Sequence, residues 1–208
     1  MKSRPAVIVL AAGTGSRFVA PGHKLTQSVG SSTVLGSTLR HAIASHLPVV
    51  VVTTAALADA ARRHVASRDV VVLPDAGTPG PQPLGMGFSI AAGVAARPDA
   101  NGWLVLPGDM PMVQTATLLA VASALEHHPV AYAQHRGRRG HPVGFSTELY
   151  SELVTLSGDE GARRLVARYP AHGVEVDDPG VLIDVDTEAD LEHVRVTHAA
   201  RAAAPVSR

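Results

Sequence analysis

The chain has 208 residues, of which 46% are hydrophobic, and this is enough for one large domain with a substantial core. Its 18 basic and 18 acidic residues balance and only 3% of residues are aromatic, which argues against a polynucleotide-binding protein. The absence of cysteine excludes disulfides, thiolate metal sites and cysteine nucleophiles, and fits the cytoplasm, where we expect the protein to work. No segment approaches the roughly 18 uninterrupted apolar residues of a membrane span.

Short apolar runs alternate along the chain with segments of helical spacing. The expected strands cover residues 6–11, 48–53, 70–73, 103–106, 130–134 and 181–185. The expected helices cover residues 34–47, 57–66, 88–96 and 117–127. This series of βαβ units predicts a single Rossmann-like, three-layer α/β/α domain with a mostly parallel sheet.

Four further segments complete this outline. Residues 74–87 are rich in proline and glycine, which predicts a long loop inside the domain. A basic turn at 136–140 lies between two strand-like runs and indicates a hairpin or crossover that departs from the parallel order. Thr187 and Asp190 resemble a capping box that opens a last helix. We expect the domain to cover residues 1–198 and the tail, 199–208, to be disordered.

The first expected strand runs into a glycine-rich loop, Leu-Ala-Ala-Gly-Thr-Gly-Ser-Arg-Phe, at residues 10–18. Glycines let backbone N–H groups approach anionic oxygens, so the loop predicts a nucleotide phosphate site; the alternative is a plain tight turn. Neither the third glycine of a dinucleotide-binding loop nor the Gly-Lys-Ser/Thr of a Walker A loop follows. Arg17 and Lys24 instead place two cations close to this site, unless they are ordinary surface charges.

Three aspartates are candidate metal ligands. Asp109 follows the strand at 103–106, and ligands bind beyond the carboxyl ends of strands in open α/β sheets. A carboxylate there suits Mg²⁺, which takes one or two carboxylates together with waters and substrate phosphates. Alternation along the strand expected at 181–185 sends Asp184 and Asp186 to one face, just before the last helix. The alternative is that these residues only form turns or start a helix.

The glycine loop followed by a lysine resembles the opening signature of the MobA-like nucleotidyltransferases, and most closely that of the MocA-like molybdenum cofactor cytidylyltransferase branch. Matching motifs follow in order at residues 85–89 (Gly-Met-x-x-Ser), 108–111 (Gly-Asp-x-Pro), 140–142 (Gly-His-Pro), 158–163 (Gly-Asp-x-Gly-Ala-Arg) and 184–187 (Asp-x-Asp-Thr). The resemblance extends from about Ala6 to Val194 and implies the fold of the nucleotide-diphospho-sugar transferases. The chain departs from it at Val19, where a glycine is usual, and in the spacing that leads to Lys24.

The resemblance implies a role for each motif. The nucleotide-binding residues would be Leu10, Ala11, Ala12, Gly13, Thr14, Gly15, Lys24 and Ser89. The catalytic residues would be Arg17, which steadies the departing pyrophosphate, Lys24, which offsets charge at the α-phosphate, and Asp109. Asp109 and Asp186 would hold Mg²⁺, with Asp184 as the alternative to Asp186. The acceptor-binding residues would be Arg139, His141, Asp159 and Arg163.

The implied reaction is transfer of CMP from CTP to the molybdopterin cofactor with release of pyrophosphate, and the product would pass to a client molybdoenzyme. Ala11-Ala12-Gly13, in place of the Gly-Gly pair of the guanylyl branch, favours cytidine. A guanylyl- or sugar/polyol-phosphate nucleotidyltransferase is the nearest alternative. From other classes, a flavin- or nicotinamide-dependent oxidoreductase would need the missing third glycine, and a non-catalytic cofactor carrier would tolerate loss of Asp109.

Overall fold

A computed structural model describes residues 4–74 and 85–203. Its main sheet has seven strands in the order β5-β4-β1-β6-β8-β7-β9. Along the chain they are β1 (Ala6–Ala11), β4 (Val49–Thr54), β5 (Val70–Leu73), β6 (Trp103–Pro107), β7 (Val130–His135), β8 (Arg138–Phe145) and β9 (Ala171–Glu175). The neighbours from β5 to β6 are parallel, β8 is antiparallel to both β6 and β7, and β9 is parallel to β7. A small antiparallel pair, β2 (Ser28–Val29) and β3 (Ser32–Thr33), stands apart.

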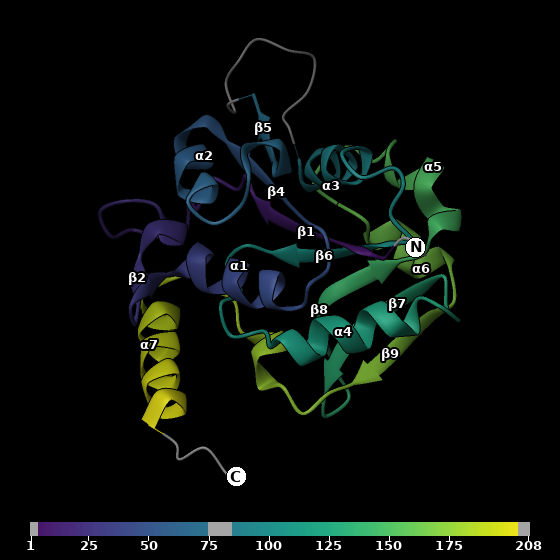
Figure 1. Cartoon of the computed structure of the whole chain (residues 1–208). Coiled ribbons are helices and arrows are strands. Elements are labelled where there is room, and N and C mark those ends of the chain that lie inside the picture. Colours follow the sequence, from purple (N-terminus) through teal and green to yellow (C-terminus); the bar gives the residue numbers. More distant parts are fainter. Residues whose placement is uncertain (1–3, 75–84, 204–208) are drawn as a thin grey trace.

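Helices cover both faces of the sheet and give the expected three-layer α/β/α fold (Figure 1). The α-helices are α1 (Val34–Ala44), α2 (Ala55–Arg62), α3 (Met86–Ala95), α4 (Thr115–Ala124), α5 (Tyr150–Leu153), α6 (Arg163–Arg168) and α7 (Glu188–Ala203). Short 3₁₀ turns are η1 (Lys24–Thr26), η2 (Ser67–Asp69), η3 (Thr147–Leu149) and η4 (Pro179–Leu182). Residues of α1, α2, α4 and α7 pack on one face, and residues of α3, α5 and α6 on the other.

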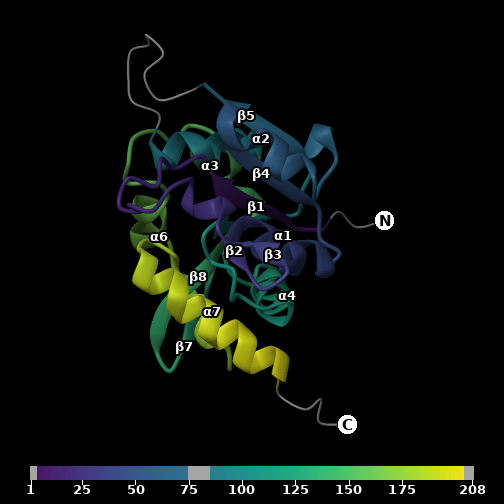
Figure 2. The same ribbon diagram turned by 90° about the vertical axis from the view of Figure 1, so that its left-hand side faces the viewer.

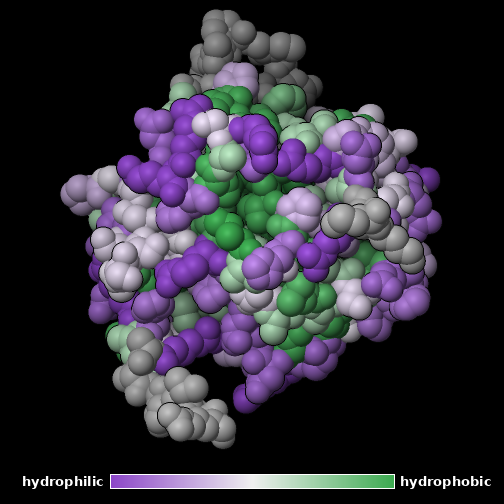
Figure 3. All heavy atoms as spheres, in the orientation of Figure 1, coloured by the Kyte–Doolittle hydropathy of each residue, from purple (hydrophilic) through white to green (hydrophobic). Residues whose placement is uncertain are grey.

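The central strands are buried on both faces, as their apolar sequences require. Along β1, Val7 and Val9 join one core cluster, while Ala6 and Ile8 join the other. In the view of Figure 3, hydrophobic residues gather in the middle of the face, and hydrophilic residues surround them. The period-two alternation of β1 therefore divides its side chains between the two helical layers.

The prediction of a last strand at residues 181–185 is wrong. Residues 179–182 form the turn η4, and residues 183–186 are irregular. The side chain of Asp178 accepts from the Gly180 backbone N–H at 3.0 Å, and Pro179 opens the turn. The segment also crosses β8 so closely that a Cβ on Gly140 would lie 2.2 Å from the Val181 carbonyl oxygen. Since β8 already pairs with β6 and β7, it has no free edge for a further strand.

Other predictions hold or shift at their ends. The basic turn joins β7 and β8 as an antiparallel hairpin, with Arg136 and Gly137 at positive φ. The predicted loop at 74–87 lies largely outside the described residues, and its last two residues already belong to α3. The strand β9 was not predicted, because its sequence Ala-His-Gly-Val-Glu lacks a strong apolar pattern.

The final helix extends into the segment 199–208, for which the sequence predicts a disordered tail. Helix α7 continues to Ala203, past the expected domain end at residue 198, because alanine and arginine favour helix. The Arg201 guanidinium donates to the Met112 carbonyl at 3.2 Å and ties this last turn to the domain. Figure 2 shows α7 along one side of the molecule beside β2, and Arg195 donates to the Ser28 carbonyl there at 3.0 Å. None of the described helices has the length and apolarity needed to cross a bilayer.

Candidate active site

A cleft of about 860 Å³ opens beyond the carboxyl ends of β1 and β6. The glycine loop that follows β1 forms one end of it, which we call the glycine-loop end. The first residues of β8 form the opposite side, which we call the β8 end. The predicted residues that line the cleft are Leu10, Ala11, Ala12, Gly13, Thr14, Gly15, Arg17, Lys24, Ser89, Asp109, Arg139, His141, Asp159, Asp184 and Asp186. The structure thus brings together residues that are far apart in the sequence.

A backbone hydrogen bond joins the end of β1, where the glycine loop begins, to the turn that carries Asp109. The Gly108 N–H donates to the Leu10 carbonyl at 2.8 Å, and a Cβ on Gly108 would lie 2.9 Å from the same oxygen. On the other side of β1, the buried Thr53 hydroxyl donates to the Ala11 carbonyl at 3.1 Å. The glycine loop and Asp109 are therefore held at one edge of the sheet, as the parallel order of β1 and β6 requires.

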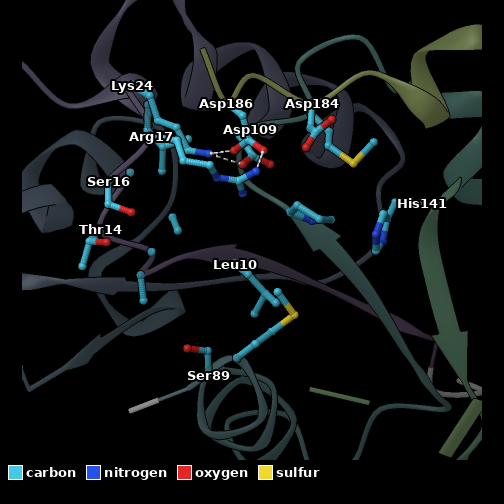
Figure 4. Close-up of a pocket in the computed structure, with 18 of the residues that line it drawn as sticks. Leu10, Thr14, Ser16, Arg17, Lys24, Ser89, Asp109, His141, Asp184 and Asp186 are labelled. Atoms are coloured by element: carbon cyan, nitrogen blue, oxygen red, sulfur yellow. Dashed lines mark hydrogen bonds and ion pairs between the residues drawn. The ribbon is translucent and has the colours of Figure 1, made fainter. Parts of the chain in front are cut away.

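Lys24 lies between two of the predicted metal ligands (Figure 4). Its Nζ donates to Asp109 Oδ2 at 2.6 Å and to Asp186 Oδ1 at 2.8 Å. Arg17 Nη1 lies 2.8 Å from the other oxygen of Asp186. Burial alone would lower the pKa of Lys24, but the hydrogen bonds and charges of Asp109 and Asp186 outweigh it and raise this pKa above its ordinary value. Lys24 is therefore a cation held in place by both carboxylates.

The two carboxylates fit a small divalent cation. Asp109 Oδ1 is buried and has no hydrogen-bond partner among the described residues, and a metal ion would satisfy such an oxygen. Among the described residues, no group of three or more His, Asp or Glu side chains could enclose a metal ion. Two carboxylates suffice for Mg²⁺, because it keeps waters and takes substrate phosphates as further ligands.

Asp186, rather than Asp184, pairs with the Lys24 ammonium group that also binds Asp109. The pKa of Asp184 is raised by burial and then by the negative charge of Asp186, and no hydrogen bond joins Asp184 to Lys24 or Arg17. The Val185 N–H donates to the Asp109 carbonyl at 2.9 Å and fixes the segment beside the β6 turn. Asp186 is therefore the carboxylate that pairs with the same ammonium group as Asp109.

The predicted capping box holds Asp186 from the other side. Asp190 Oδ2 accepts from the Asp186 N–H at 3.2 Å and from the Thr187 N–H at 2.8 Å. In return, the Thr187 hydroxyl oxygen accepts from the Asp190 N–H at 3.2 Å. The first turn of α7 thus orients the backbone that carries the Asp186 carboxylate.

Asp178 is a positioning residue that the sequence did not reveal. Its buried carboxylate accepts from the Gln114 N–H at 2.8 Å and from the Thr117 hydroxyl at 2.7 Å at the start of α4, besides the Gly180 N–H. It thereby anchors η4, which leads to Asp184 and Asp186. The Asp-Asp-Pro-Gly sequence at 177–180 signals a turn, but its link to α4 crosses about sixty residues.

The β8 end is lined by basic and apolar side chains. The Arg139 guanidinium carbon lies 4.6 Å from the centre of the Tyr132 ring, a cation–π contact that steadies this arginine. Burial, the largest influence, lowers the pKa of His141, and the nearby Asp109 opposes this only in part, so His141 is neutral at pH 7. Arg138, Met86 and Leu182 also line the cleft, although they were not among the predicted site residues.

Arg163 does not line the cleft. It lies at the first position of α6, and its side chain is exposed. The motif at 158–163 thus contributes Asp159 to the cleft but not the arginine predicted with it, because Arg163 follows the turn in which the chain enters α6. Ser89 is buried in the first turn of α3 and lines the cleft as predicted.

Comparison with known proteins places this geometry in a family. Residues 7–174 match the profile described as the MobA-like NTP transferase domain. The purine catabolism protein PucB of Bacillus subtilis (strain 168) is 34% identical over 116 residues, which are 53% of this chain and 56% of that protein. The match therefore spans only about half the length of this curated relative.

Solved structures match over nearly the full chain. The crystal structure of Rv0371c from Mycobacterium tuberculosis H37Rv has a TM-score of 0.79 and 29% identity, covering 94% of this chain and 99% of that one. The structure of Rv0371c in complex with manganese has a TM-score of 0.76 and 28% identity, covering 94% of this chain and 100% of that one.

Proposed function

The chain belongs to the MobA-like NTP transferase family, and on that premise we propose that it is a Mg²⁺-dependent cytidylyltransferase that transfers CMP from CTP to the molybdopterin cofactor. The observation that carries the proposal is the meeting of Lys24, Arg17, Asp109 and Asp186 beside the glycine loop, in one cleft with a basic β8 end. Nucleotidyl transfer needs this combination, because it depends on positioning and charge neutralisation.

In this reaction an oxygen of the acceptor phosphate attacks the α-phosphorus of CTP in line with the bond to the β-phosphate. That bond breaks, and pyrophosphate leaves with the bonding electrons. Backbone N–H groups of Gly13, Thr14 and Gly15 bind the triphosphate, Lys24 neutralises charge at the α-phosphate, and Arg17 holds the departing pyrophosphate. When bound by Asp109 and Asp186, Mg²⁺ supplies further neutralisation of phosphate charge.

The finer assignments have separate support. The manganese held by the related Rv0371c supports a divalent cation in this chain. The Ala11-Ala12-Gly13 sequence at the start of the cleft supports cytidine over guanine. Arg138 and Arg139 at the β8 end suit an acceptor that carries a phosphate, as the molybdopterin cofactor does. A client molybdoenzyme would then receive the product.

Pyrophosphate release tests the proposal. The purified chain is incubated with molybdopterin cofactor and each of the four nucleoside triphosphates, with and without Mg²⁺. We expect rapid release with CTP and Mg²⁺, and only slow release with the other three triphosphates or without the metal. A preference for GTP would make the chain a guanylyl sibling. Binding of the cofactor without pyrophosphate release from any triphosphate would make it a carrier and overturn the proposal.

A further inference from the structure

His23 joins the glycine loop to the turn that carries Lys24. Its Nε2 lies 3.0 Å from the Gly13 carbonyl oxygen, and its Nδ1 accepts from the Leu25 N–H at 3.1 Å. Because Nδ1 accepts a hydrogen bond, it carries no proton in this arrangement, so the proton of the neutral ring is on Nε2. Nε2–H therefore donates to the Gly13 carbonyl, and one side chain holds two loops together.

The identity of the residue matches this double contact. His23 is the N-cap of η1, a position where Ser, Thr, Asp or Asn usually accepts a backbone N–H. A serine or aspartate at this position would satisfy the Leu25 N–H, but it lacks a donor on the far side of the side chain. The imidazole carries an acceptor and a donor on different edges of a rigid ring, so it can cap the turn and bind the Gly13 carbonyl at once.

The bond to the Gly13 carbonyl fixes the peptide that faces the cleft. In a trans peptide, the carbonyl of one residue and the N–H of the next point in opposite directions. With the Gly13 carbonyl directed at His23, the Thr14 N–H points away from His23. Among the described residues other than 12–14, no heavy atom lies within 4 Å of the position of a Gly13 Cβ, so no side chain packs against Gly13 on that side. Without His23 the peptide could rotate and present an oxygen to a phosphate.

The same contact sets the position of Lys24. A Cβ on Gly15, which has a φ of +64°, would lie 3.4 Å from Lys24 Cγ and 3.5 Å from His23 Nε2. The glycine loop thus passes directly over the lysine stem and the imidazole. The segment 19–24 is also where the sequence departs from the family spacing, so His23 fixes a lysine whose position the motif alone does not determine.

We propose that His23 is a positioning residue, which holds the glycine loop and Lys24 in the arrangement that binds the triphosphate. The inference rests on the proposed function only in requiring that the cleft binds a nucleoside triphosphate, and it does not depend on the base or the acceptor. It concerns binding of the triphosphate rather than of the acceptor.

Three variants separate the two contacts of the ring. His23→Ala removes both. His23→Asn keeps an acceptor where Nδ1 lies and so retains the cap, but its amide is too short to reach Gly13. His23→Gln places an amide N–H near the position of Nε2 and so retains the bond to Gly13. Thr26→Ala is the matched control, because the Thr26 hydroxyl donates to the His23 carbonyl in the same turn at 2.8 Å but does not line the cleft.

CTP binding in the presence of Mg²⁺ is measured by calorimetry, together with KM for CTP, KM for the acceptor and the melting temperature. We expect His23→Ala and His23→Asn to weaken CTP binding about tenfold, which corresponds to one lost hydrogen bond. The CTP affinity of His23→Gln should stay within about threefold of the wild-type affinity. KM for the acceptor and CTP binding by Thr26→Ala should not change. The Asn and Gln variants carry the test even where the alanine variant fails to fold.

Two results would overturn the proposal. In the first, folded His23→Asn binds CTP as tightly as the wild type does. In the second, the CTP affinities of the variants follow their melting temperatures, and His23→Gln binds CTP no better than His23→Asn does. Failure of the proposed function looks different, because the wild-type chain itself would then not bind CTP; the same variants are in that case compared with the triphosphate that the wild type binds. The chain has only two lysines, Lys2 and Lys24, so NMR of ¹³Cε-labelled lysine offers a direct view of Lys24. We expect its signal to move in His23→Asn and to stay in place in His23→Gln.

Discussion

The glycine-loop end and the β8 end of the cleft differ in how their charges are held. At the glycine-loop end, Lys24, Arg17, Asp109 and Asp186 form a network of ion pairs between 2.6 and 2.8 Å long. At the β8 end, no hydrogen bond or ion pair engages the side chain of Arg138 within the part of the chain that the structure describes, and Arg139 makes only a cation–π contact with Tyr132 there. One end is organised before a substrate binds, whereas the other presents charges that await a partner.

The difference teaches how one cleft can serve two substrates. Every nucleoside triphosphate has the same phosphates, so the groups that bind them can be fixed in advance at little cost to versatility. The carboxylates also keep Lys24 and Arg17 close to where phosphate oxygens would bind. The acceptor is the more variable partner, and a less constrained set of side chains suits it.

The substitution with the largest expected effect removes one negative charge from the glycine-loop end. Asp109→Asn keeps the size of the side chain but weakens metal binding. We expect turnover at saturating CTP and Mg²⁺ to fall by about 10³-fold or more, because charge neutralisation at the phosphates carries most of the catalysis. The measurement is pyrophosphate release. Asp59→Asn is the matched control, since Asp59 is exposed and its ion pair within the described residues is with Arg62 on the surface of α2. Retention of a tenth of the turnover by Asp109→Asn would contradict the assignment.

Lys24→Met should separate metal binding from catalysis. The methionine keeps much of the stem but removes the Nζ that lies between Asp109 and Asp186. We expect turnover to fall about 10²-fold, while Mn²⁺ binding without nucleotide, followed by electron paramagnetic resonance, tightens about tenfold because a competing cation is gone.

Weaker Mn²⁺ binding by Lys24→Met would show that the lysine supports the metal site instead of competing with it. The wild-type chain provides the comparison for the same titration. In the wild type, Mn²⁺ should bind more tightly when CTP is present, because the phosphates supply ligands and draw Lys24 and Arg17 away from the carboxylates.

The sequence predicted the organised end well for a definite physical reason. The strands β1 and β6 are valine- and leucine-rich runs buried on both faces, and parallel strands bring their carboxyl ends together. Asp109 and the glycine loop could therefore be placed in one cleft from the strand pattern and the family resemblance. The three-layer fold followed from the same alternation of strands and helices.

The rest depends on contacts that a one-dimensional pattern does not contain. His23 and Asp178 act through hydrogen bonds to Gly13 and to α4, and neither lies in a recognisable motif. The strand expected at 181–185 failed because β8 already has two partners, and pairing partners are a property of the whole sheet. Arg163 was assigned from the order of its motif, which does not determine the direction of a side chain.

A double substitution tests the role of the β8 end of the cleft. Arg138→Ala with Arg139→Ala removes two positive charges from the cleft without touching the ion pairs around Lys24. We expect KM for the phosphate-bearing acceptor to rise about 10- to 100-fold, with KM for CTP nearly unchanged, because the loss of one charge-assisted contact costs about 1.5–3 kcal/mol. Steady-state kinetics with each substrate varied in turn makes the measurement.

Arg163→Ala is the matched control for that experiment, since it removes an exposed arginine outside the cleft. Equal effects of Arg163→Ala and of the double variant on the acceptor would mean that general positive charge, not the lining of the cleft, attracts the acceptor. A rise in KM for CTP in the double variant would instead place the triphosphate at the β8 end.

The smallest expected effect concerns the support of Asp186 by α7. Hydrogen bonds from Thr187 lower the pKa of Asp190, so its ionised form is stabilised in the folded protein. Such a group contributes stability that is present above the pKa of an unfolded aspartate, about 3.9, and that is lost as the pH falls through the lower folded value. Asp190→Ala should therefore cost about 1 kcal/mol of unfolding free energy at pH 7, a typical value for a helix cap, and less at pH 3.

Denaturant unfolding at both pH values tests this, with Asp190→Asn as a companion that keeps the acceptor oxygen but not the charge. Because Asp190 also accepts from the Asp186 N–H, we expect turnover of Asp190→Ala to fall only about two- to threefold, the effect of a loosened ligand and not of a lost one. An equal stability loss at pH 3 and pH 7 would assign the effect to packing. A turnover loss as large as that of Asp109→Asn would mean that the backbone of α7, and not the ion pairs around Lys24, fixes the organised end of the cleft.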